Sequence, residues 1–169
     1  NLPSYVVIHG GQVPAGGMQC FGSGFLPANH QGSTFLSNHP VLNNTTFKES
    51  SAEIQKKKLD FLHYIDGDLE ARVAHAEAIE SAIQNYELAF KMQREVPYVA
   101  DISNESEATK KLYGLDAPFE NTRSYAAQCL MARRLVERGV RFVELTINPG
   151  NGDRWDQHHN LIDGHQKNA

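Results

Sequence analysis

Near its C-terminus the chain passes from a helical pattern, through a single glycine, into a run of apolar residues. The helical pattern covers residues 122–138, and Gly139 stands where a helix commonly ends. Residues 140–147 are almost fully apolar, as in a strand that is buried on both faces of a parallel sheet. Residues 5–8 form a second short β-branched run, followed by His-Gly-Gly. A helix joined to a buried strand in this way predicts an α/β fold with a mainly parallel sheet.

The middle of the chain is predicted to be rich in helix. Ser50 and Glu53 stand three residues apart and fit a capping box, and Gly67 is expected to end the first helix. From residue 73 to 90, apolar residues recur at steps of three and four, which indicates an amphipathic helix that Pro97 is expected to stop. The helices expected here cover residues 50–67, 68–94 and 106–113, with Gly114 closing the last.

Residues 12–44 are rich in Gly, Pro, Asn and Ser, which predicts a long irregular segment. Phe21, Phe25, Leu26 and Phe35 are interspersed in it, and aromatic residues are scarce in disordered segments. We therefore expect a packed loop that faces a substrate or supports the fold. Its glycines do not match a phosphate-binding loop, because no Gly-Lys-Ser/Thr ends the run.

Length and charge exclude several classes of protein. The 169 residues are enough for one domain with a core, so residues 1–169 are treated as one domain. The formal net charge of −4 gives no basic field that would attract nucleic acid. No apolar run approaches the roughly 20 residues needed to span a bilayer. The chain opens on Asn1 without a leader, as a processed product or a fragment does.

The segment Trp-Asp-Gln-His-His at residues 155–159 carries the strongest chemical signal. It follows the predicted 140–147 strand, and ligands in open α/β sheets bind beyond the carboxyl ends of the strands. Asp156 and His158 are two residues apart, so in an extended segment they point to the same side, while His159 points away. Asp and His side chains are ligands for divalent metals. A solvated polar loop explains the residues equally well, and two ligands alone do not complete a site.

Two further histidines are candidates for the same cleft. His9 follows the first predicted strand, so it could line the cleft and contact a substrate, as could His159. A plain turn histidine is the favoured alternative for His9. His165 could be a further ligand or a substrate contact, although an exposed place on a terminal helix explains it better.

Several phrases of the chain resemble a family of secreted bacterial sulfatase-like proteins in the alkaline phosphatase superfamily. The resemblance covers nearly the whole chain in the same order, and the phrases are specific in combination rather than singly. They are residues 1–4 (Asn-Leu-Pro-Ser), 21–27 (Phe-Gly-Ser-Gly-Phe-Leu-Pro) with 31–32, 86–93 (Tyr-Glu-Leu-Ala-Phe-Lys-Met-Gln), 105–109, 112–116, 129–143 and 155–158 (Trp-Asp-Gln-His).

The resemblance implies an α/β/α sandwich and the hydrolysis of phosphate or sulfate esters at a site with one or two metals. It implies that Asp156 and His158 are metal ligands, with Zn, Ca, Mn or Mg as the divalent metal. It further implies a small-molecule or polysaccharide ester as substrate, and a periplasmic or secreted protein. The chain lacks the sulfatase nucleophile phrase Cys/Ser-x-Pro-x-Arg, and the family's flanking phrases are missing. We therefore expect an internal fragment with an incomplete sulfatase-like domain.

Two other interpretations stay open. A secreted module without catalytic activity could retain the fold as a binding or scaffold protein, which the missing nucleophile phrase favours. A self-contained α/β fold of 169 residues with no enzyme function is the third possibility.

Overall fold

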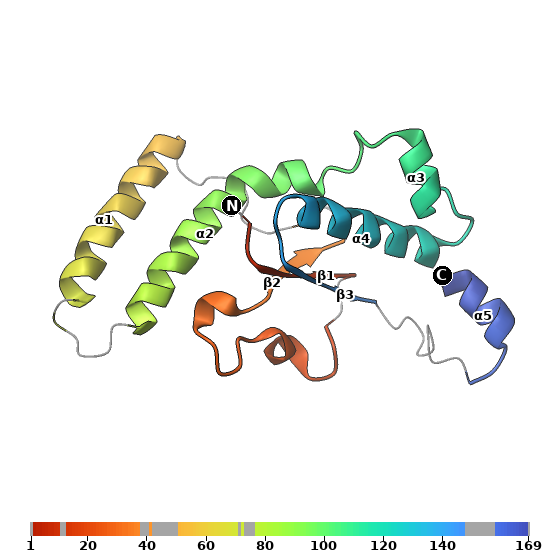
Figure 1. Cartoon of the computed structure of the whole chain (residues 1–169), viewed down its shortest axis with the longest axis horizontal. Helices are drawn as coiled ribbons and strands as arrows, with labels where there is room; N and C mark the ends of the chain where they lie inside the picture. The colour runs from red at the N-terminus through yellow and green to blue at the C-terminus, as the bar shows by residue number, and fades with distance from the viewer. Residues whose placement is uncertain are drawn as a thin grey trace.

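The computed structural model describes residues 2–10, 13–37, 41, 51–70, 72, 77–147 and 158–168. Figure 1 shows a small sheet with long helices above it and an irregular segment below it. The elements in chain order are β1 (Tyr5–His9), the 3-10 helices η1 (Gly17–Phe21) and η2 (Ala28–His30), β2 (Ser33–Leu36), α1 (Ala52–Glu70), α2 (Glu77–Ala100), α3 (Glu107–Tyr113), α4 (Glu120–Glu137), β3 (Phe142–Thr146) and α5 (Leu161–Asn168).

The sheet is parallel, as the sequence predicts, and its strand order is β2-β1-β3. β1 lies in the centre because its Val6, Val7 and Ile8 are fully buried. The register pairs Ile8 with Phe35 of β2 and with Leu145 of β3. The prediction of a mixed α/β fold with a parallel sheet is therefore confirmed.

One face of the sheet packs against α2 and α4 and forms the core. Side chains alternate along a strand, so Val6 and Ile8 point to this face together with Phe35. Burial of large apolar side chains supplies about 1.5 to 3 kcal/mol each. The buried core consists of Val6, Ile8, Phe35, Val41, Met92, Val96, Val99, Ala100, Met131, Leu135 and Val140.

The segment of residues 13–32 lies along the other face of the sheet (Figure 1). Phe21 and Phe35 are buried, as expected of a packed segment, whereas Phe25 is 97% exposed and Leu26 47% exposed, so the Phe-Leu-Pro part does not pack as expected. Gly32 passes close to the sheet, where a Cβ atom would lie 2.9 Å from Tyr5 Cε1 and 3.0 Å from Val7 Cγ2. Any other residue here would require the Tyr5 and Val7 side chains to shift. The sequence pattern missed β2, because Ser33–Leu36 is short and mixes polar with apolar residues.

Helices α1 and α2 form a hairpin that projects from the body of the molecule (Figure 1). Gly67 does not end α1, which continues to Glu70, so that prediction is wrong. Gly67 is compatible with a helix interior at a cost of roughly 1 kcal/mol relative to alanine. Ser50, the predicted capping residue, lies outside the described residues; next to it, the Ser51 hydroxyl accepts a hydrogen bond from the Ile54 backbone N–H at 3.3 Å.

Pro97 lies inside α2, which runs to Ala100, so the expected stop at Pro97 is wrong. The proline lacks an N–H and its ring crowds the carbonyl group four residues earlier, which bends a helix rather than always ending it. Figure 1 shows that α2 changes direction before its C-terminal end. The bent end packs on the core, where Val96 and Val99 are buried.

Helix α3 ends at Tyr113, as the sequence predicts, and begins one residue after the predicted Ser106. The Ser106 hydroxyl accepts a hydrogen bond from the Thr109 backbone N–H at 3.1 Å, which caps the N-terminus. Gly114 has a φ of 85°, the left-handed conformation that closes a helix. Gly139, after α4, has a φ of 90° and turns the chain toward β3.

Two arginines of α4 anchor the segment between α2 and α3. Arg133 and Arg134 both bind the Glu105 carboxylate, at 2.9 Å and 2.5 Å. Arg134 also donates to the backbone carbonyl groups of Val99 at 2.9 Å and Tyr98 at 2.7 Å.

None of the helices in the described residues combines the length and apolar character that a membrane crossing requires.

Candidate functional site

The carboxyl ends of the three strands bring His9, Leu36 and Thr146 into register. His9 is the last residue of β1, and it pairs with Leu36 on one side and with Thr146 on the other. The His9 carbonyl group accepts a hydrogen bond from the Ser37 backbone N–H at 2.9 Å, which holds the chain as it leaves β2. His9 therefore lies at the edge where open α/β sheets bind ligands, as the sequence predicts.

Partial burial lowers the pKa of the His9 imidazole below its usual value of 6.5. Desolvation disfavours the charged form and therefore favours the neutral imidazole. A neutral imidazole has a lone pair that can accept a proton or coordinate a metal. His9 is thus chemically suited to a ligand or base role.

A polar row along the same face of the sheet was missed by the sequence pattern. Tyr5 and His9 of β1 share this face with Glu144 and Thr146 of β3, because the residues alternate in register. The Tyr5 hydroxyl donates to Glu144 Oε2 at 2.6 Å, and burial together with this bond raises the pKa of Tyr5 to about 12. The Thr146 hydroxyl donates to the Ile8 carbonyl at 3.4 Å. The signal in the sequence is the alternation of Glu144 and Thr146 with apolar neighbours.

The C-terminal candidates lie only partly within the described residues. Asp156 lies outside them, so its predicted role as a metal ligand has no structural counterpart here. His158 and His159 are both exposed and precede α5. His165 lies on α5 and is partly buried rather than exposed.

Helix α5 packs beside the first turn of α4, where the Thr122 hydroxyl donates to the Lys167 carbonyl at 3.3 Å. Because α4 runs antiparallel to β3, its N-terminal end lies toward the carboxyl ends of the strands (Figure 1). The histidines beside α5 are therefore on the same side of the molecule as His9.

The described residues by themselves do not form a complete metal centre. Within these ranges, no group of three or more His, Cys, Asp or Glu side chains is arranged so that it could hold a metal ion. Both cysteines, Cys20 and Cys129, are free thiols. A metal bound through Asp156 and His158 would need donors beyond those that the described residues bring together.

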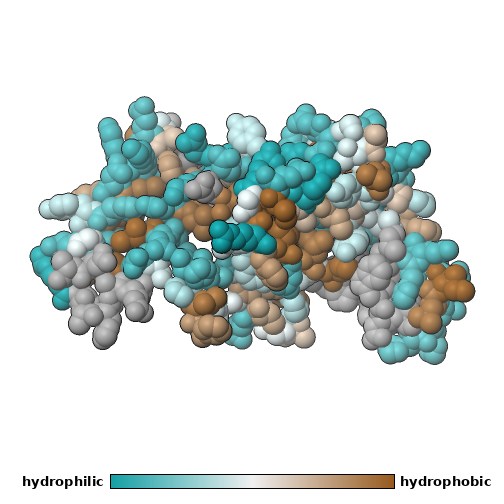
Figure 2. Space-filling view, viewed as in Figure 1, coloured by the Kyte–Doolittle hydropathy of each residue, from teal (hydrophilic) through white to brown (hydrophobic). Residues whose placement is uncertain are grey.

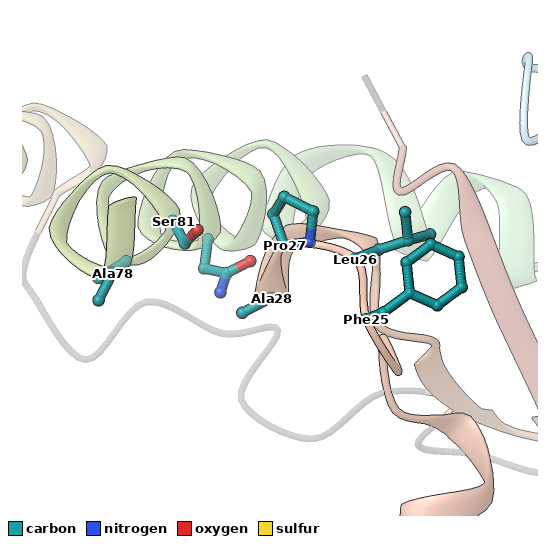
Figure 3. A pocket seen from close by; sticks show the side chains of 8 residues that line it. Phe25, Leu26, Pro27, Ala28, Ala78 and Ser81 are labelled. Atoms are coloured by element: carbon teal, nitrogen blue, oxygen red, sulfur yellow. The ribbon is translucent and has the colours of Figure 1, made fainter. Parts of the chain in front are cut away.

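A groove of about 490 Å³ lies between α2 and the loop that carries the Phe-Leu-Pro phrase (Figure 3). Its walls are mostly apolar, with the Ser81 hydroxyl and the Asn85 amide as polar groups. It lies on the side of the molecule away from α5 (Figure 1), so it is separate from the strand ends. The groove is lined by Phe25, Leu26, Pro27, Ala28, Ala78, Ser81, Ala82 and Asn85.

Comparison with known proteins gives one match. The model of the family described as "Protein of unknown function (DUF1501)" matches residues 1–169. No curated protein and no solved structure matches the chain.

Proposed function

This chain belongs to the DUF1501 family, and we propose that it contributes to a metal-dependent site that hydrolyses phosphate or sulfate esters. The observation that carries the proposal is the register of His9 and Thr146 at the carboxyl ends of β1 and β3. The sequence then leads from β3 to Asp156 and His158, the ligand types suited to a divalent metal. Strand ends of a parallel sheet are the usual place for such a site.

The residues of the proposed site have distinct roles. Asp156 and His158 bind the divalent metal, which is Zn, Ca, Mn or Mg. When bound, the metal polarises a phosphoryl or sulfuryl oxygen as a Lewis acid. His9, kept neutral by partial burial, and His159 contact the substrate.

The proposed substrate is an ester of a small molecule or a polysaccharide, and the proposed location is the periplasm or the cell exterior. Both follow from the resemblance of the sequence to sulfatase-like proteins. Fractionation of cells that produce the natural protein tests the location, and protein confined to the cytoplasm would contradict it.

Isothermal titration with Zn²⁺, Mn²⁺, Ca²⁺ and Mg²⁺ tests the ligand assignment. Asp156→Ala and His158→Ala should each weaken binding of the preferred metal about 10- to 100-fold, as the loss of a ligand or its support does. His30→Ala is the matched control, because His30 lies in η2, apart from the strand ends. Equal affinity in all variants would refute the assignment.

Hydrolysis of aryl phosphate and aryl sulfate by the protein at its natural length tests the reaction. Activity should disappear with a chelator and return with the metal. The alternative is a binding or scaffold protein without catalysis, favoured by the absence of a Cys/Ser-x-Pro-x-Arg phrase in this sequence. That alternative predicts no turnover with any metal, and chelator-sensitive turnover would rule it out.

A further inference from the structure

Helix α1 carries a stripe of large apolar side chains that the rest of the described structure leaves exposed. On a helix with 3.6 residues per turn, these side chains lie within roughly 100° of arc, the width of the apolar face that an amphipathic helix normally buries. Their exposed fractions run from 38% to 61%. The stripe consists of Ile54, Phe61, Leu62, Ile65 and Leu69.

The contact with α2 uses a different side of α1. Gln55 donates to Gln93 of α2 at 2.9 Å, and His63 lies 3.6 Å from Glu87 of α2. Between them on α1, Leu59 is partly buried beside Phe90. The contact with α2 thus runs through Gln55, Leu59 and His63, and the centre of the apolar stripe lies roughly 100° away around the helix axis. Figure 2 shows apolar side chains reaching an otherwise hydrophilic surface over this hairpin.

The charges of α1 are divided between its two halves. Residues 52–58 hold Lys56, Lys57 and Lys58 against one acid, Glu53. Residues 60–70 hold several acids and neither Lys nor Arg. Two copies of α1 that run antiparallel place each basic half opposite an acidic half, whereas a parallel pair places like charges together.

We propose that the α1 stripe is the interface of a two-fold dimer, in which α1 of one chain packs antiparallel against α1 of a second copy. Centred between Phe61 and Leu62, this pairing brings Ile54 of each chain opposite Leu69 of the other. The stripe is thus self-complementary, as a two-fold interface requires. The interface joins the hairpins of two chains and leaves the carboxyl ends of their strands uncovered, so it does not depend on the proposed hydrolysis.

Sedimentation of the 169-residue chain between about 1 and 100 μM tests the dimer. The weight-average mass should rise with concentration toward twice the chain mass of 18.8 kDa. Phe61→Glu and Leu62→Glu should each weaken the dimer roughly tenfold or more, because each buries a charge at the centre of the interface. A chain that stays monomeric throughout would overturn the proposal and leave the stripe to a different partner.

Leu112→Glu is the matched control, since Leu112 is an exposed leucine on another helix, α3, with 83% of its side chain accessible. This control variant should dimerise like the parent chain. Circular dichroism and thermal melting should show that both stripe variants remain folded, because Phe61 and Leu62 are exposed in the single chain. A dimer that survives both stripe substitutions would place the interface elsewhere and refute the proposal.

Cysteine cross-linking tests the direction of the pairing, in a background with Cys20→Ser and Cys129→Ala. Ile54→Cys mixed with Leu69→Cys should form a disulfide between the two variants. Ile54→Cys alone should form little, because an antiparallel pair keeps its two copies roughly 22 Å apart along the helix axis. Efficient cross-linking of Ile54→Cys to itself would show a parallel pair and overturn the antiparallel geometry.

Discussion

Tyr5 and Glu144, which lie 139 positions apart in the sequence, are joined by a hydrogen bond of 2.6 Å between the phenol and the carboxylate. The bond links the first strand to the last and lies beside the edge-to-face contact of Tyr5 with Phe142, whose ring centroids are 5.1 Å apart. It thus joins β1 to β3 on the face of the sheet that also carries His9.

Tyr5→Phe should lower the free energy of unfolding by about 0.5 to 1.5 kcal/mol, because the partly buried Glu144 loses its donor. Urea denaturation measures the change. Tyr64→Phe is the matched control, since 77% of Tyr64 is exposed on α1, and it should change the free energy by less than about 0.5 kcal/mol. Equal effects of the two substitutions would contradict the role of the Tyr5 bond.

The stability of the fold should also fall at high pH. Burial and the bond to Glu144 raise the pKa of Tyr5 from 10.0 to about 12, so folding favours the protonated phenol. This contribution is fully present below pH 10 and is lost as the pH rises from 10 to 12. Burial also raises the pKa of Tyr125, so absorbance titration of tyrosinate should show more than one late-titrating group, of which Tyr5→Phe removes one. A titration in which that group persists in the variant would assign it to another tyrosine.

At low pH the critical group is Glu105. Hydrogen bonds from Arg134 and Arg133 lower the pKa of its carboxyl group below 4.5. The stability that this carboxylate contributes is present above the unfolded pKa and is lost as the pH falls through the lower, folded pKa. Glu105→Gln should therefore reduce the thermal midpoint at pH 7 and flatten its decline in acid. Glu107→Gln, at an exposed site on α3, should retain the parent profile, and an equal loss in both variants would contradict the assignment.

The ion pairs around Glu105 could not be predicted from the sequence. Three arginines near the end of α4 suggest an interaction with the helix dipole, which is a local effect. In the structure Arg133 and Arg134 instead reach a carboxylate 28 and 29 positions earlier. The contact with Glu105 depends on how α2 and α3 pack against α4. The spacing of residues along the chain does not predict this packing.

Some local signals predicted local structure correctly and others did not. The closing glycine of α3 is present as predicted, and the two apolar runs form neighbouring parallel strands, whereas the stops expected at Gly67 and Pro97 are absent. Helix α2 continues past Pro97, against the prediction, because packing of Val96 and Val99 in the core outweighs the loss of one helical hydrogen bond. The place of His9 at the carboxyl end of β1 was predictable, because it follows from the strand pattern. The remaining donors of the proposed site were not, because a single sequence does not tell which side chains face Asp156.

Leu135→Ala tests the contact of α4 with the sheet. Leu135 is fully buried in the core, so its truncation leaves a cavity and should cost about 2 to 5 kcal/mol of unfolding free energy. Leu112→Ala, on the exposed side of α3, should cost less than about 0.5 kcal/mol. Denaturant unfolding of the two variants gives the comparison, and a small loss at Leu135 would show that α4 does not cover the sheet.

Replacement by alanine is expected to change the stability of the fold in opposite directions at Gly67 and Gly139. Gly67 lies within α1, and a Cβ atom there meets nothing within 4 Å, so Gly67→Ala should stabilise the fold by about 0.5 to 1 kcal/mol. Gly139 has a φ of 90°, which alanine tolerates poorly, so Gly139→Ala should destabilise the fold by roughly 1 to 2 kcal/mol. Thermal melting of both variants distinguishes the continuous α1 helix from one that ends at Gly67, because a helix-ending glycine would make Gly67→Ala destabilising as well.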